Sequence, residues 1–431
     1  MRKILLLFLA LPILFLSCNS NKCRQLCTEK GLDEDCCPKI DSTNLLTANA
    51  KIDKINIFIE TSGSMAGYMP ASKPATEFQL VITDILSKIN SKFSGKVSIY
   101  FMAEQNKPCI KIDFEKAKND VLNGAFIWSG STYIPSMIDS VSDYLKTNSV
   151  NILVSDFIYS PEKGKSKITE IASSDLYSLV TPFTKYSSSF ICLFSEYRSS
   201  ICADKNPTEK SPYYLFLQGK AENIRVIESV IYESISKSNS AYKEINFGLN
   251  YKMPYYSVLP YTETTSNYIA NSCASFQYAF VSIQDINLDS YGSKIEFWLG
   301  LDLNDFPEYS KTKDYLKQNL EISLNNGEFE ILTIEKLPYS NVASDDKPIA
   351  QRCTHIVKLK ISNLSECVSV LSLSLKCSLP DWRKSLNENV SENNREKTFG
   401  LEKIISGFEQ AYCQKQGEYF FKNLPISLIK E

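Results

Sequence analysis

A carboxylate and two hydroxyls occupy alternate positions directly after an apolar run near residue 60. The run is Ile55–Ile59, and the side chains belong to Glu60, Ser62 and Ser64. Alternate residues of an extended chain point to the same side, so these oxygen groups should gather above the end of a strand. Hard divalent cations such as Mg²⁺ prefer oxygen ligands of this kind. The segment therefore predicts a metal site where a strand passes into a loop.

Two later segments carry oxygen side chains that suit the same site. Thr132 follows Ser-Gly-Ser at 129–131 and precedes a run with helical spacing that begins at Ile134. Asp156 follows the apolar run Val150–Val154 and one serine. Each residue also fits a plainer role, because Thr commonly caps a helix N-terminus and Asp commonly closes a turn.

In this order the three segments resemble the metal-binding loops of the von Willebrand factor A (vWA) domain family. That family has a D-x-S-x-S loop, a Thr after Gly, and an Asp after a buried strand. The resemblance covers residues 52–236 and implies a metal site made by Glu60, Ser62, Ser64, Thr132 and Asp156. It implies that hydroxyls bind the ion directly and carboxylates act through water. The ion would then accept a carboxylate from a protein ligand.

Two positions depart from the family pattern. Glu60 stands where the family places Asp, and Phe157 stands where Gly is usual. The extra methylene of Glu displaces the carboxylate by about 1 Å, and Mg²⁺ demands near-octahedral geometry. Three outcomes remain open: the loop compensates, a larger ion such as Mn²⁺ or Ca²⁺ replaces Mg²⁺, or the site is vestigial.

Residues 51–237 alternate apolar runs with segments of helical spacing. This pattern predicts an α/β domain with a doubly wound, mostly parallel sheet covered on both faces, here vWA-like. The stretch 196–210 is expected to be a surface insertion. The expected strands are 55–59, 97–102, 150–154, 190–194 and 213–217, and the expected helices are 78–89, 134–145, 168–183 and 224–235.

Residues 238–431 show a different pattern. Apolar and polar residues alternate with a period of two in short segments, and polar loops separate these segments. The pattern predicts an all-β, sandwich-like domain with a C-terminal amphipathic helix at 398–411 and a last strand within 417–429. The other expected strands are 245–249, 277–283, 294–303, 320–324, 329–334, 354–361 and 368–375.

The N-terminus resembles a bacterial lipoprotein signal. A basic start at residues 1–3 precedes an apolar run over 4–16 and then Cys18, the expected lipidation site at the end of a 1–18 signal peptide. An ordinary cleaved signal peptide is the alternative. Lipidation implies attachment to the bacterial cell envelope, by default the outer membrane, with either face possible.

Residues 19–50 form an expected cysteine-rich tether. Cys23, Cys27, Cys36 and Cys37 lie there, among 13 cysteines in the whole chain. Such cysteine usage fits an oxidising compartment and predicts disulfides, although four cysteines allow three pairings. Free thiols are the alternative.

The net charge and the histidine content argue against several classes of function. The chain has 431 residues, a net charge of −2 and one histidine, His355. The absence of a basic excess argues against a nucleic-acid partner. A single histidine argues against catalytic triads, and no G-x-S-x-G motif is present, so a serine hydrolase is the least favoured class.

We therefore expect a non-enzymatic protein, anchored to a membrane, that mediates binding or adhesion through a divalent cation and a protein ligand. The alternative is a non-catalytic structural component of a cell-envelope complex in which the metal site is vestigial.

Overall fold

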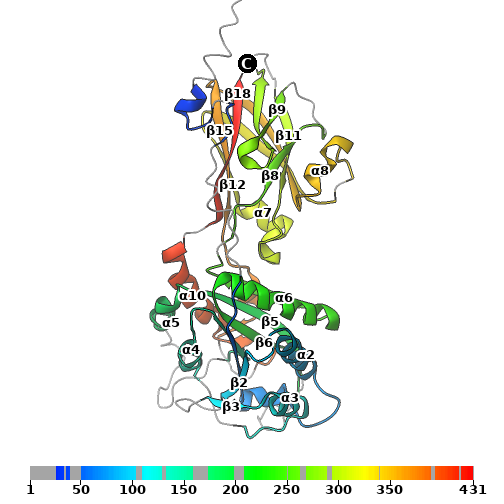
Figure 1. The fold of residues 1–431 in the computed structure, drawn as a ribbon, viewed down its shortest axis with the longest axis vertical. Helices are drawn as coiled ribbons and strands as arrows, with labels where there is room; N and C mark the ends of the chain where they lie inside the picture. The colour runs from blue at the N-terminus through cyan, green and yellow to red at the C-terminus, as the bar shows by residue number, and fades with distance from the viewer. Residues whose placement is uncertain are drawn as a thin grey trace, which may run out of the picture.

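The chain folds into two units stacked along the long axis of the molecule (Figure 1). We call them the α/β unit, which is built on a seven-stranded sheet, and the β unit, which is built on two smaller sheets. The computed structural model describes residues 26–33, 35–38, 50–102, 109–128, 133–158, 173–198, 208–249, 251–262, 268–288, 294–338, 340–389, 394–416 and 419–430.

The sheet of the α/β unit is mixed, with the strand order β3-β2-β1-β4-β6-β5-β7. Strand β1 pairs in parallel with β2 and with β4, whereas the other pairs are antiparallel. The predicted α/β class is confirmed, but the prediction of a mostly parallel sheet is wrong outside the three strands β2, β1 and β4. The strands are β1 (Lys54–Glu60), β2 (Val97–Met102), β3 (Ile110–Ile112), β4 (Ser149–Ser155), β5 (Ser187–Tyr197), β6 (Thr208–Gly219) and β7 (Tyr242–Phe247).

A long antiparallel pair explains the difference. Strands β5 and β6 pair from Ser187 opposite Gly219 to Tyr197 opposite Thr208. Both ends of the expected insertion at 196–210 therefore belong to strands. The pairing leaves β6 antiparallel beside β4, and β7 then adds to the outer side of β5. β7 comes from the range that the sequence pattern assigned to the second domain.

Helices cover both faces of this sheet, as the alternating pattern predicts. One face packs against α2 (Glu77–Lys92), α3 (Phe114–Asn123) and α6 (Ala221–Ser238). The opposite face packs against α4 (Ile134–Ser142), α5 (Ser173–Val180) and α10 (Leu401–Gln416). Short 3₁₀ turns η2 (Gly63–Gly67) and η4 (Thr181–Phe183) complete the unit.

Local sequence signals set the helix ends. The Thr76 hydroxyl accepts a hydrogen bond from the Gln79 backbone, and the Gln79 side chain accepts one from the Thr76 backbone, a capping box that starts α2. Asp113 caps α3 by accepting from the Lys116 backbone. Gly124 ends α3 at φ +62°, and a Cβ there would lie 2.4 Å from the Met69 carbonyl oxygen, so only glycine fits.

Helix α10 comes from the C-terminal part of the chain but packs in the core of the α/β unit. Its Phe408 contacts Phe190, Phe216 and Phe247, with ring centroids 4.9, 5.4 and 5.8 Å away. The helical spacing at 398–411 predicted the helix, although the pattern placed it with the second domain. The same excursion contributes α9 (Trp382–Ser385) and the strand pair β16 (Asn387–Glu388) and β17 (Thr398–Phe399).

The β unit consists of two sheets around one shared hydrophobic core. The larger sheet has the order β12-β15-β18-β10-β9 and the smaller one β13-β14-β11-β8. All pairs are antiparallel except β10 with β18, which confirms the predicted all-β character. The strands are β8 (Tyr256–Leu259), β9 (Ile269–Cys273), β10 (Ala279–Ile286), β11 (Ile295–Leu301), β12 (Leu320–Leu324), β13 (Gly327–Lys336), β14 (His355–Leu364), β15 (Val368–Lys376) and β18 (Tyr419–Lys430).

Short helical elements decorate the β unit at the ends of its strands. They are η5 (Ala274–Phe276), η6 (Glu308–Lys311), α7 (Lys313–Asn319), η7 (Ser344–Asp346) and α8 (Lys347–Ala350).

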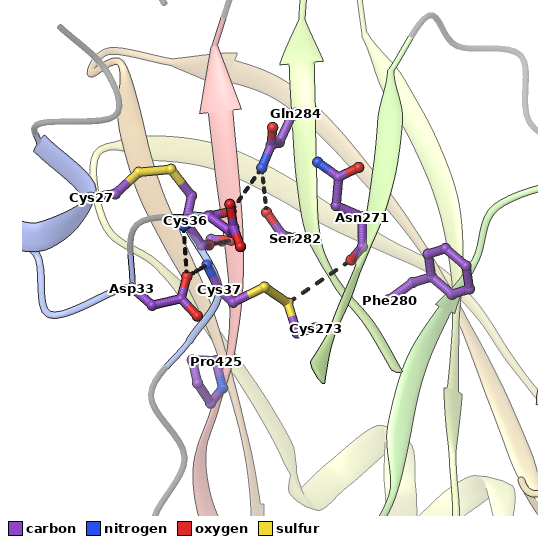
Figure 2. The surroundings of a disulfide bond; sticks show 12 residues. Cys27, Asp33, Cys36, Cys37, Asn271, Cys273, Phe280, Ser282, Gln284 and Pro425 are labelled. Carbon is purple, nitrogen blue, oxygen red and sulfur yellow. Dashed lines mark hydrogen bonds between the residues drawn. A yellow bond between two sulfur atoms is a disulfide. The ribbon is translucent and has the colours of Figure 1, made fainter. Parts of the chain in front are cut away.

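The described part of the cysteine-rich segment is bound to the β unit. Disulfides join Cys27 to Cys36 and Cys37 to Cys273, the last residue of β9 (Figure 2). Ser427 of β18 also donates a 2.6 Å hydrogen bond to the Cys36 carbonyl. The predicted disulfides are confirmed, whereas Cys18 and Cys23 lie outside the described residues. In the part of the chain that is described, no helix is long and apolar enough to span a membrane.

A buried polar cluster lies where the two units meet. Glu244 of β7 accepts a 2.7 Å hydrogen bond from the Glu308 backbone of the β unit, and its own carbonyl accepts one from the Trp382 indole. Close by, Glu228 of α6 accepts a 2.6 Å hydrogen bond from Ser189. Burial is the main cause that raises the pKa of Glu228 from 4.5 to about 7, and the Glu244 charge adds to it.

This carboxyl makes stability depend on pH. The folded chain holds the Glu228 proton more tightly than the unfolded chain. Protonated Glu228 therefore makes its full contribution to the free energy of unfolding below about pH 4.5, and this contribution is lost as the pH rises past 7. We expect Glu228→Gln to match wild type near pH 5 and to exceed its free energy of unfolding by about 2–3 kcal/mol at pH 8. Chemical denaturation at both pH values measures the difference.

Glu233→Gln is the matched control, because Glu233 lies on the same helix with 71% of its side chain exposed. We expect no pH-dependent gain for it. A Glu228→Gln curve parallel to wild type from pH 5 to pH 8 would contradict the assignment of this pH dependence to Glu228.

Candidate functional site

Strand register brings the first and last predicted loops of the candidate site together. β1 and β4 are parallel neighbours, with Ile59 opposite Val154. The Asn56 amide donates a 2.8 Å hydrogen bond to Asn151 directly across this pair, in the buried core. The strands therefore end level with each other, and the residues that follow both strands share one edge of the sheet.

Glu60, the last residue of β1, is buried and held by the neighbouring strand. Its Oε2 accepts a 2.5 Å hydrogen bond from the Ser155 hydroxyl. Ser155 in turn accepts a 2.9 Å hydrogen bond from the Phe157 backbone. Ser155 therefore links the end of β1 to the turn after β4. The sequence pattern did not single out this serine.

Phe157 adopts a left-handed conformation in that turn, with φ +51°. Its ring is fully buried and packs against Phe190, Tyr214 and Phe216. A non-glycine residue with this backbone is strained, and the aromatic contacts supply the compensating stabilisation. These contacts explain how phenylalanine is accommodated in a turn whose backbone favours glycine.

The hydroxyls of the first loop connect to Asp156. Ser62 and Ser64 hydrogen-bond to each other at 2.9 Å, and the Ser64 side chain hydrogen-bonds to Asp156, which partly opposes the rise in the pKa of Asp156 that burial causes. Asp156 Oδ1 also accepts from the Ile158 backbone at 3.1 Å. The structure thus brings together Glu60, Ser62, Ser64 and Asp156 of the predicted set. Thr132 lies outside the described residues.

Asp156 also faces a cation that the sequence pattern did not predict. The guanidinium of Arg395 lies with one nitrogen 4.0 Å from Asp156 Oδ2, and both side chains are buried. Burial is the largest influence on Asp156 and raises its pKa, whereas the Arg395 charge opposes that rise. Arg395 therefore stabilises the charged form of this carboxylate.

Arg395 is held by an aromatic ring of the α/β unit. Its guanidinium carbon lies 4.8 Å from the centre of the Tyr197 ring, a distance suited to a cation–π interaction. Tyr197 in turn packs edge-on against Tyr68, which is buried after the first loop and hydrogen-bonds to Ser211. The segment around Arg395 is fixed nearby, because Thr398 and Tyr214 share a 2.8 Å hydrogen bond.

The donor set can be tested against a cation. Glu60, Ser62, Ser64 and Asp156 offer only hard oxygen atoms, which suit Mg²⁺ or Ca²⁺. Asp156 Oδ2 is buried and makes no hydrogen bond, so an ion bound there would compete with the charge of Arg395, 4.0 Å away, and not with a hydrogen bond. Within the described ranges, however, no group of three or more His, Cys, Asp or Glu side chains is arranged to hold a metal. Binding would therefore depend on the hydroxyls.

Comparison with models of known protein families, with curated proteins and with solved structures finds no match for this chain.

The contact between Ser155 and Glu60 makes a direct prediction about stability. Ser155→Ala removes a hydroxyl donor from a buried carboxylate, and we expect the free energy of unfolding to fall by about 1–3 kcal/mol. Urea denaturation measures the change. Ser229→Ala, on the exposed face of α6, is the control and should differ little from wild type. Equal stability of the two variants would show that this hydrogen bond contributes nothing.

Proposed function

We propose that this chain is a membrane-anchored binding protein of the bacterial cell envelope. Its α/β unit would bind a protein ligand through a divalent cation at Glu60, Ser62, Ser64 and Asp156, with Thr132 as a further ligand. The anchor would be a lipid on Cys18. The observation that carries the proposal is the convergence of these oxygen side chains at the adjacent ends of β1 and β4.

The chemistry of the residues supports binding without turnover. Ser62 and Ser64 would hold the ion as neutral ligands, while Asp156 supplies negative charge and Glu60 stays fixed by Ser155. When bound, the cation would supply an electron-poor centre able to accept a ligand carboxylate. Mg²⁺ is the first choice, and Mn²⁺ or Ca²⁺ fits if the longer Glu60 enlarges the site.

One observation favours a second function. Arg395 already places a positive charge beside Asp156, and Ser155 already engages Glu60. Both carboxylates are therefore partly compensated within the chain. This arrangement suits a structural component of an envelope complex in which the metal site is vestigial.

Calorimetry separates the two functions. We expect Mg²⁺ or Mn²⁺ to bind the full chain, purified in detergent, and Ser62→Ala and Asp156→Asn to weaken binding by at least about tenfold. Ser229→Ala is the control for a lost hydroxyl away from the site. Failure of both ions to bind, or equal affinity in Ser62→Ala, would reject the cation-dependent function in favour of the structural one.

Arg395 gives an independent prediction. A guanidinium beside Asp156 repels a divalent ion, so Arg395→Gln should tighten Mn²⁺ binding several-fold while lowering the free energy of unfolding by about 3 kcal/mol. Calorimetry and denaturation measure the two effects on one sample. Arg383→Gln is the control, because Arg383 pairs with Glu402, away from Asp156. Unchanged or weaker Mn²⁺ binding in Arg395→Gln would contradict a cation site at Asp156.

A further inference from the structure

A polar pocket of about 380 Å³ opens on the β unit, in a region to which the proposed function assigns no role. It is bounded by the start of β8, by the η5 turn, by the loop after β11 and by the residues before β14. Its volume lies in the range of small-molecule sites. The side chains that matter below are Tyr255, Phe276, Gln277, Asp302, Asn304 and Arg352.

Three planar groups form one wall of this pocket. The rings of Tyr255 and Phe276 are nearly parallel, with centroids 6.0 Å apart and planes 13° apart. The guanidinium of Arg352 lies 3.6 Å from the centre of the Tyr255 ring and donates a 2.5 Å hydrogen bond to Gln277. Stacking and this hydrogen bond both fix the guanidinium, so little rotamer freedom remains to be lost on binding.

Arg352 is exposed, and no ion pair engages it among the residues that the structure describes. A guanidinium carries five N–H donors, so donors remain for a ligand. Phe276 is buried, with 2% of its surface exposed, so the apolar surface beside these donors comes from the part of Tyr255 that the guanidinium leaves uncovered.

The loop that carries Gln277 is held in place. Gln277 and Tyr278 both adopt left-handed backbone conformations, at φ +51° and +59°, which strain residues other than glycine. The Cys37–Cys273 disulfide fixes the start of the loop (Figure 2), and the Tyr278 backbone donates a 3.1 Å hydrogen bond to the Cys273 carbonyl. A strained loop held by a covalent bond keeps Gln277 against Arg352.

The remaining lining is polar and balanced in charge. Asp302 offers a carboxylate that accepts a 3.1 Å hydrogen bond from the Asn304 backbone, and the amides of Gln277 and Asn304 offer both donors and acceptors. One arginine and one aspartate leave this set of side chains with no net charge. A phosphate or nucleic acid would meet no positive excess there.

We propose that this pocket binds a neutral sugar ring of a glycan. Each sugar hydroxyl both donates and accepts, which matches the mixture of amide, carboxylate and guanidinium groups. Arg352 and Asp302 would bind neighbouring hydroxyls, and the uncovered part of the Tyr255 ring would contact the C–H groups of the sugar. The site lies in the β unit and does not depend on a cation at Asp156.

Calorimetry on the full chain in detergent tests this, with maltotriose, cellotriose and chitotriose as probes. We expect at least one trisaccharide to bind, and Arg352→Ala and Asp302→Asn each to weaken it at least tenfold. Arg225→Ala and Asp305→Asn are matched controls. Arg225 also lies over a tyrosine ring, 5.2 Å from the centre of Tyr251, and Asp305 is an exposed aspartate three residues after Asp302. Both controls should bind like wild type.

Three results would overturn the proposal. The first is that none of the three sugars binds. The second is that Arg352→Ala and Asp302→Asn leave sugar binding unchanged. The third is that free glycine or phenylalanine binds and the sugars do not. The last result would assign the pair Arg352 and Asp302 to a zwitterion. Because both side chains reach solvent, we expect unfolding transitions like that of wild type, which denaturation checks.

Discussion

The parallel pairing of β1 with β4 is the constraint on which the candidate site depends. The pairing places the ends of the two strands level, and the buried hydrogen bond between Asn56 and Asn151 is made only in this register. A slip of one residue would exchange the faces of a strand and would separate Glu60 from Ser155. The first loop and the turn after β4 are therefore built on one choice of register.

A second dependence comes from the return of the chain to the α/β unit after β15. Without α10, the aromatic face made by Phe190, Phe216 and Phe247 would lack the helix that covers it. The same return brings Arg395 beside Asp156. The chain then passes back into the β unit, where β18 lies between β10 and β15. The segment after β15 thus supplies α10 to the core of the α/β unit and β18 to the core of the β unit.

The sequence predicted the positions of helices and strands better than it predicted which strands pair and in which direction. The apolar runs at 55–59 and 150–154 and the helical spacing at 78–89 are local, and local patterns indicate a strand or a helix directly. A buried strand such as β6 has the same pattern whether its neighbour is parallel or antiparallel, so the mixed sheet could not be read from it. The grouping of Glu60, Ser62, Ser64 and Asp156 was expected because their loops resemble, in sequence, the metal-binding loops of vWA domains.

The contact of Arg395 with Asp156 had no signal in the sequence. Arg395 lies in a polar stretch far along the chain, and neither spacing nor periodicity connects it to β4. Ser155 was missed for another reason, because its role depends on which strand lies next to it. Long-range placement of single polar residues is the part of a site that local patterns do not encode.

The disulfide between Cys37 and Cys273 also has a mechanical consequence. Tension applied to the N-terminal segment enters the β unit through a covalent bond, so the segment cannot peel away from β18 one hydrogen bond at a time. The chain also passes between the units after β7, after β15 and before β18. A force that pulls the two units apart would therefore be shared among several connecting segments. The units would resist separation more strongly than two domains joined by a single linker.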